Sequence, residues 1–306
     1  MTQIVVMKAW EGFADRLQVL SHLIHYCLVN HAILCVDWRD ENWGQGKWDF
    51  SDFFELIGMP VMPLEMISNM ENAKIVPSCW TLETITKPMT KLQLLDEFTC
   101  PIMRNNFEKI EGDIIVTNGK GFRKFFAGNI TDNIRFKRPV ADLIQHKLQH
   151  FYLPATVIHL RGTDRYNHEL INTWFKDYDT LMPHSKARVY HISDSKNLMN
   201  EWTKKVPHSE LCIKDTSILK IPTVIKCGTH QLSKEALEFY SVTKYDLIID
   251  VLADFMALSF ATDAIGNRKS VFFEMARLIS GCGPKLTGNI LLGYQPQTKS
   301  LVQIPT

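Results

Sequence analysis

Short apolar runs alternate along the chain with longer stretches in which apolar residues recur at helical spacing. Residues 4–7 and 32–36 are continuously apolar, as is typical of strands that are buried on both faces of a parallel sheet. Between them, residues 16–29 place several leucines on one face of a predicted helix. A strand, a helix and a second strand of these lengths predict one right-handed βαβ unit.

A second run of the same kind begins near residue 156. Its pattern predicts strands over 156–160, 188–192, 211–213 and 263–266, and helices over 168–181, 196–205, 247–260 and 271–280. The intervening segment is less regular, with a strand over 113–116 and a helix opened by Pro139, and the tail over 293–306 resembles a terminal strand. Two separate runs predict two α/β domains, residues 1–150 and 151–306. A ligand is then expected at the carboxyl ends of the strands, in a cleft between the domains.

Charge and cysteine content narrow the class of protein. The 306 residues include 34 Lys+Arg and 33 Asp+Glu, and this balance argues against bulk nucleic acid or an anionic membrane as partner. The longest apolar stretch is interrupted by histidines and asparagine, so no membrane span is expected. Seven scattered cysteines without a CxxC pair are expected to be reduced thiols in a cytoplasm, and no metal site is predicted.

The densest group of chemically active residues follows the strand at 156–160. Strand alternation puts His159 and Arg161 on one face at the carboxyl end of that strand, and Asp164, Arg165 and Glu169 come soon after. A guanidinium there can grip a phosphate with two hydrogen bonds and neutralise charge on a departing phosphate group. The alternative is an ordinary turn in which Asp164 pairs with Arg165 or caps the next helix.

Two weaker candidates for an anion-binding site lie at the starts of predicted helices. The loop that contains Gly12, Ala14 and Asp15 leads from the first strand into the first helix and could cradle an anion, although it lacks the GxGxxG pattern and could be a bare connection. Ser270 opens the last predicted helix, where it could donate to a phosphate or act only as an N-cap.

Asp254 is polar within a strongly apolar helix, so it points into a cleft or meets solvent.

Two other patterns have an ordinary structural explanation beside a functional one. The Asp177-Tyr178-Asp179 sequence matches a metal-binding DxD motif, but its place near the end of an amphipathic helix favours a solvated helix face. An aromatic group after the second strand could stack on sugar rings, whereas a satellite hydrophobic cluster is the more common explanation. Its members are Trp38, Trp43, Trp48 and Phe50.

Several of these segments, in this order, resemble one family. Residues 11–17, Glu-Gly-Phe-Ala-Asp-Arg-Leu, followed by Ile-Leu-Cys-Val-Asp-Trp-Arg at 33–39, resemble the opening of the bacterial nodulation-type α-1,6-fucosyltransferases. Residues 159–165 are similar to the His-x-Arg-Arg-Thr-Asp-Lys motif of the eukaryotic core α-1,6-fucosyltransferases, and 192–195 and 254–270 resemble later motifs. The chain departs from the family at Gly162, which replaces the second basic residue, and at Ala14, which replaces a glycine.

The resemblance implies a GT-B-like fold, in which an acceptor-side Rossmann-type domain faces a GDP-binding one across a cleft. It further implies a metal-independent, inverting transfer of L-fucose from GDP-fucose to a hydroxyl of a glycan. By this resemblance, Arg161 binds the β-phosphate of GDP, and His159, Asp164 and Arg165 surround it. The other contacts with the diphosphate are implied for Gly12, Ala14, Asp15 and Ser270. Asp194 and Asp254 are implied to contact guanosine, and Glu169 to accept the proton of the acceptor hydroxyl. Other donors such as GDP-rhamnose or GDP-mannose, or an inactive glycan- or nucleotide-binding module, remain alternatives.

Overall fold

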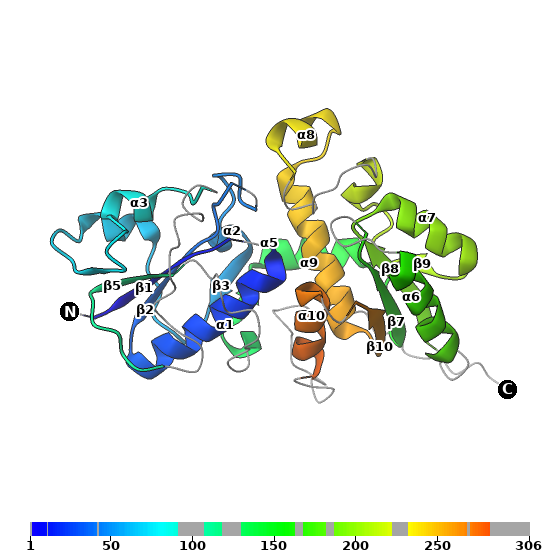
Figure 1. Cartoon of the computed structure of the whole chain (residues 1–306), viewed down its shortest axis with the longest axis horizontal. Coiled ribbons are helices and arrows are strands. Elements are labelled where there is room, and N and C mark those ends of the chain that lie inside the picture. The colour runs from blue at the N-terminus through cyan, green and yellow to red at the C-terminus, as the bar shows by residue number, and fades with distance from the viewer. Residues whose placement is uncertain are drawn as a thin grey trace. The chain divides into compact units, whose positions relative to one another are not determined.

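The chain folds as two compact α/β units, residues 1–137 and 138–306, each built on a four-stranded parallel sheet (Figure 1). The computed structural model describes residues 2–10, 12–41, 43–90, 107–117, 130–162, 168–181, 187–221, 232–267 and 270–281. Two parallel sheets confirm the predicted fold class. The sequence placed the domain boundary at residue 150, whereas the helix α5 (Arg138–Lys147) groups with the second unit because it packs against a helix of that unit.

The sheet of the first unit has the strand order β2-β1-β5-β4. Its strands are β1 (Ile4–Lys8), β2 (Ile33–Asp37), β5 (Ile114–Thr117) and β4 (Ile75–Val76). Helix α1 (Phe13–Asn30) connects β1 to β2 and confirms the predicted βαβ unit. Every residue of β1 is buried, which explains why that strand is continuously apolar up to Lys8.

Short elements complete the first unit, and the sequence did not predict them individually. An antiparallel ribbon pairs β3 (Phe54–Leu56) with β6 (Ile134–Phe136). The helical pieces are α2 (Phe50–Phe53), η1 (Leu64–Asn69), α3 (Leu82–Thr86) and η2 (Ile130–Asp132). Each has at most six residues, too few for a periodic pattern to be recognised.

The sheet of the second unit has the strand order β10-β7-β8-β9. Its strands are β7 (Ala155–Leu160), β8 (Arg188–Ser193), β9 (Glu210–Leu211) and β10 (Asp263–Gly266). Besides α5, its helices are α6 (His168–Leu181), α7 (Lys196–Lys205), η4 (Ser217–Lys220), α8 (Lys234–Phe239), α9 (Lys244–Phe260) and α10 (Val271–Gly281). The predicted bounds of α6, α7 and β10 are confirmed, and the expected terminal strand at 293–306 lies outside the described residues.

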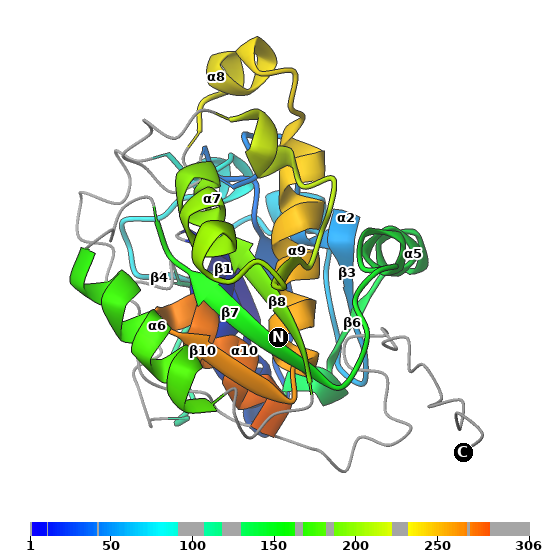
Figure 2. The ribbon, with the colours of Figure 1, turned by 90° about the vertical axis from the view of Figure 1, so that its right-hand side faces the viewer.

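Helices cover both faces of this second sheet (Figure 2). On one face, Ile158 and Leu160 of β7 form a core with Trp174 of α6 and Leu198 of α7. Because successive strand residues point to opposite faces, His159 points to the other face, toward α9 and α10. The alternation therefore directs His159 to the α9 and α10 side of the sheet and Leu160 to the opposite side.

The two ambiguous sequence patterns have structural roles. Trp38, Trp43 and Phe50 are buried, and their rings pack edge-on or stacked with one another or with Phe13 and Phe54, which confirms a satellite hydrophobic cluster for these three. The fourth expected member, Trp48, is only half-buried and lies beside Phe53. On α6, the two carboxylates of the DxD sequence are exposed, as expected for a solvated helix face. None of the helices in the described part of the chain is long and apolar enough to cross a membrane.

Candidate functional site

Arg161 lies just beyond the carboxyl end of β7 and forms an ion pair with a carboxylate that follows β8. Asp194, directly after β8, accepts a hydrogen bond from the Gly162 amide at 2.6 Å through Oδ1, and its Oδ2 lies 3.3 Å from Nη1 of Arg161. The Arg161 side chain is still 21% exposed. Asp194 thus positions both the guanidinium and the turn, while part of the Arg161 side chain stays exposed.

Gly162 has no room for a side chain. A Cβ atom at this position would lie 2.4 Å from Cδ1 of Leu198 and 2.5 Å from Cβ of Ser195, both at the start of α7. This close approach explains physically why glycine stands where the family motif has a second basic residue. Asp164 and Arg165, the expected neighbours of Arg161, lie outside the described residues.

His159 lies on the face of the second sheet that α10 covers, and its ring is uncharged. Its side chain is stacked on Phe273 of α10, with ring centroids 6.1 Å apart and an interplanar angle of 11°. Burial, assisted by the positive charge of Arg161, lowers the pKa of His159 to about 3, so the imidazole is neutral at physiological pH. Nδ1 is buried and has no hydrogen-bond partner among the described residues. His159 can therefore shape this site or hydrogen-bond a ligand, but it adds no positive charge.

Ser270 opens α10, the helix that stacks on His159. Its carbonyl oxygen accepts from the amide of Glu274 at 3.0 Å, and its Oγ lies 3.5 Å from the amide of Phe273, as in an N-cap. A hydroxyl that accepts a hydrogen bond keeps its own hydrogen for donation. The cap and the expected phosphate contact are thus compatible at this residue.

Asp254 is half-buried on α9 and interacts electrostatically with Asp250 and Asp194 of the second unit. Burial, followed by the charges of Asp250 and Asp194, raises the pKa of Asp254 well above its usual range, while Lys147 opposes this shift. Asp194 and Asp254 come from a strand end and a helix, and the fold brings them together as the expected guanosine contacts would require. No sequence pattern indicated Lys147, which lies on α5 and pairs with Asp250 of this group.

The expected loop candidates in the first unit lie at the start of α1. Gly12 is the N-cap residue of α1 in an extended conformation, Ala14 is buried, and Asp15 lies in the first turn. Arg16 is fully buried, pairs with Asp40 and stacks against the indoles of the aromatic cluster, so its charge is used inside the unit. The roles of Gly12, Ala14 and Asp15 toward a diphosphate stay predictions.

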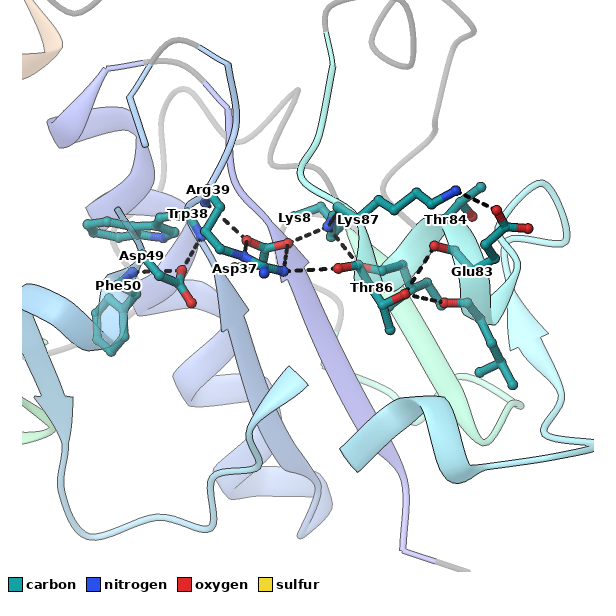
Figure 3. Close-up of polar contacts among 12 residues, drawn as sticks. Lys8, Asp37, Trp38, Arg39, Asp49, Phe50, Glu83, Thr84, Thr86 and Lys87 are labelled. Atoms are coloured by element: carbon teal, nitrogen blue, oxygen red, sulfur yellow. Dashed lines mark hydrogen bonds and ion pairs between the residues drawn. The ribbon is translucent and has the colours of Figure 1, made fainter. Parts of the chain in front are cut away.

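A buried charged network at the carboxyl ends of β1 and β2 was not predicted (Figure 3). Lys8 and Asp37 are register partners and form an ion pair that is almost completely buried. Arg39 donates from Nε to Asp37 at 3.0 Å and from Nη2 to the carbonyl of Thr86 at 3.1 Å. Burial alone would raise the pKa of Asp37, but the two cations outweigh it and hold the pKa below its usual range. The only sequence signal is a lysine that ends an otherwise apolar strand.

Glu169, the expected base, lies in the first turn of α6, shortly after β7. Within the described ranges, His, Cys, Asp and Glu side chains form no group of three or more that could hold a metal ion. Of the expected residues in the second unit, the structure brings together His159, Arg161, Asp194, Asp254 and Ser270 around the carboxyl ends of β7 and β8 and the start of α10.

Among solved structures, this fold matches that of fucosyltransferases. The fucosyltransferase NodZ from Bradyrhizobium aligns over 91% of this chain and 94% of its own, with a TM-score of 0.61 and 17% sequence identity. A crystal of NodZ α-1,6-fucosyltransferase soaked with GDP-fucose gives a TM-score of 0.59 at 17% identity, covering 91% of this chain and 93% of that chain. No protein-family model and no curated protein matches the sequence. The expected GT-B-type fold is confirmed.

Proposed function

We propose that this chain is a glycosyltransferase that moves L-fucose from GDP-fucose to a hydroxyl of a glycan, with inversion and without a metal ion. The observation that carries the proposal is the guanidinium of Arg161, which is partly exposed and is paired with Asp194 at the carboxyl end of a parallel strand. The second support is the fold, which is that of NodZ structures soaked with GDP-fucose or co-crystallised with GDP.

The chemistry needs positive charge where GDP departs. When the bond between the sugar's anomeric carbon and the β-phosphate oxygen breaks, its electron pair goes to GDP, and negative charge grows on that phosphate. A guanidinium that is already oriented stabilises this charge without reorganisation during the reaction. Ser270 would donate its hydroxyl hydrogen to the same diphosphate, and neutral His159 would line the site.

The acceptor hydroxyl attacks the opposite face of the sugar and must lose its proton. We assign that proton to the carboxylate of Glu169, which then releases it to solvent. Asp254 would accept hydrogen bonds from guanine, and Asp194 would mainly keep Arg161 in place, because both of its oxygens already contact the β7 turn.

The test compares two arginines at opposite ends of one sheet. Arg161→Ala should lower kcat/KM for GDP-fucose by about 10²–10³-fold, as expected for removal of one transition-state donor. The matched control is Arg188→Ala, which removes an exposed arginine at the start of β8, where it lies over the Tyr152 ring. Near-normal turnover by the Arg161 variant contradicts the proposal.

A second arm of the same experiment addresses the base and the donor. Glu169→Gln should lose turnover while keeping its affinity for GDP, and an unchanged rate removes Glu169 from the mechanism. GDP release is measured with GDP-fucose, GDP-mannose and GDP-rhamnose over a panel of glycan acceptors. GDP binding without turnover of any donor would instead identify a binding module.

A further inference from the structure

The inference rests on the proposed function and concerns Arg39, which follows β2 at the carboxyl end of the first sheet. Open parallel sheets bind their ligands at this end of the strands. The proposed reaction has two substrates, a nucleotide sugar and a glycan acceptor, and the chain has two such sheets. The main phosphate contact of the donor is assigned above to Arg161 at the second sheet. A residue that binds the acceptor is therefore sought at the first.

One edge of the Arg39 guanidinium is bonded inside the unit (Figure 3). Nε donates to Oδ1 of Asp37 at 3.0 Å and Nη2 donates to Oδ2 at 3.4 Å, as in a two-point pair of a guanidinium with a carboxylate. Nη2 also donates to the carbonyl oxygen of Thr86 at 3.1 Å. These three bonds involve Nε and Nη2 and leave the two N–H groups of Nη1.

The terminal nitrogen Nη1 is open to a ligand. It makes no hydrogen bond within the part of the chain that the structure describes. The Arg39 side chain is 22% exposed, and Nη1 is not one of the buried polar atoms that lack a partner among the described residues. Two donors on an accessible nitrogen can bind an oxygen atom of another molecule.

The carboxylate that orients Arg39 is itself held in place by a buried lysine. The ammonium of Lys8 has no exposed surface, and it donates to Asp37, to the carbonyl oxygen of Ile85 at 2.8 Å and to that of Lys87. All three hydrogens of the ammonium are thus used. The guanidinium therefore has its orientation before a ligand arrives, which reduces the entropy lost on binding.

A purely structural role explains only part of this arrangement. The carbonyl groups that accept from Lys8 and Arg39 belong to residues 85–87 at the end of α3, where cations satisfy the last carbonyls of a helix. That role uses the ammonium and the Nη2 edge of the guanidinium, and it leaves Nη1 unexplained. An arginine, unlike a lysine, presents a second edge of fixed geometry beyond the bonded one.

We propose that Arg39 binds the glycan acceptor, with Nη1 donating to a hydroxyl oxygen of the sugar that receives fucose. Lys8 and Asp37 are positioning residues, which hold the guanidinium in the orientation that this contact needs. The contact involves a hydroxyl that does not react, so it is the same in the bound complex and in the transition state. Its loss therefore weakens acceptor binding without slowing the chemical step.

The test measures GDP release from GDP-fucose with p-nitrophenyl β-glycosides of glucose, galactose and N-acetylglucosamine as acceptors. Arg39→Lys keeps a cation beside Asp37 but loses the second edge. It should raise the KM for the acceptor by about 10–100-fold, the effect of one lost hydrogen bond to a charged group, and leave kcat and the KM for GDP-fucose unchanged. The matched control is Arg135→Lys, an exposed arginine on β6 of the same unit, which should change neither KM.

Deoxy acceptors distinguish a direct contact from a disturbed fold. With the best of these glycosides, removal of the hydroxyl that Arg39 binds should raise the acceptor KM of the parent protein by about the same factor. The same removal should have no further effect in Arg39→Lys. A variant with a disturbed fold would instead lose affinity for every deoxy acceptor alike. Effects of Arg39→Lys and of each deoxy position that simply multiply therefore overturn the inference.

The remaining outcomes separate this inference from the proposed function. An unchanged acceptor KM, or a rise confined to the KM for GDP-fucose, overturns the inference and leaves the proposed function intact. If neither these glycosides nor the wider panel of acceptors supports GDP release, both are overturned. If circular dichroism shows that Arg39→Lys is unfolded, Arg39→Met, which removes every donor, replaces it in both measurements. If neither variant folds, Arg39 is a structural residue and the inference is wrong.

Discussion

Replacing Asp49 with asparagine should stabilise the protein at neutral pH. Asp49 caps α2, and its Oδ1 accepts from the amide of Trp38 at 2.6 Å and from that of Phe50 at 2.7 Å (Figure 3). Burial, followed by the nearby charge of Asp37, raises the pKa of Asp49 from 3.8 to about 6. An asparagine keeps the accepting oxygen and never ionises.

The direction and size of this stabilisation follow from the linkage between proton binding and folding. The folded protein holds this proton more tightly than the unfolded chain does, so stability falls as pH rises from about 4 to about 6 and is level above that. The difference between 3.8 and about 6 corresponds to at most about 3 kcal/mol. Asp49→Asn should therefore raise the free energy of unfolding by up to that amount at about pH 7.5, and by almost nothing at about pH 4.

Urea unfolding followed by circular dichroism at these two pH values measures the difference. The matched control is Asp52→Asn in the same short helix, where an exposed carboxylate accepts from the Asp49 amide at 2.7 Å. The argument that ionisation of Asp49 destabilises the folded protein is refuted by a variant that is less stable than the parent at about pH 7.5. It is also refuted if the free energy of unfolding changes equally at both pH values.

Two further substitutions probe the packing and charge described above. Asp37→Asn should lower the free energy of unfolding in urea by about 3–5 kcal/mol, because it leaves Lys8 buried without its carboxylate. The control is Glu111→Gln, which removes a side chain that is 94% exposed in its pair with Lys74 and should change stability by less than about 1 kcal/mol; equal effects contradict the reasoning. Gly162→Arg restores the basic residue of the family motif, but its side chain would collide with Leu198. It should therefore lower the free energy of unfolding by about 1–3 kcal/mol or more and weaken GDP binding, whereas a stable, more active variant would show that the turn can open.

The long periodic elements could be predicted from the sequence because each buries one face or both. The longer strands, such as β1 and β7, and helices such as α6 and α7 contain enough residues for the apolar pattern to be recognised, whereas β4 has only two residues and was not predicted. The short elements of the first unit could not be predicted, since α2 and β3 have four and three residues, and their bounds depend on packing between distant segments.

The candidate site could be predicted only in part for the same reason. Arg161 and His159 follow from strand alternation, and Asp254 follows from its polarity within an apolar helix. The partnership of Asp194 with the β7 turn and the approach of Lys147 to Asp250 depend on contacts between separate elements, which no local pattern records. The lack of space at Gly162 likewise depends on where α7 begins.

Buried indoles give each unit its own optical signal. In the first unit, Trp38 and Trp43 lie beside the guanidinium of Arg16, with ring centroids 5.5 and 5.4 Å from its central carbon. In the second, Trp202 is stacked on Phe175 and donates to a serine hydroxyl. Fluorescence from such different surroundings can report separately on the melting of the two halves, so the effect of a bound nucleotide can be traced to the half that holds it.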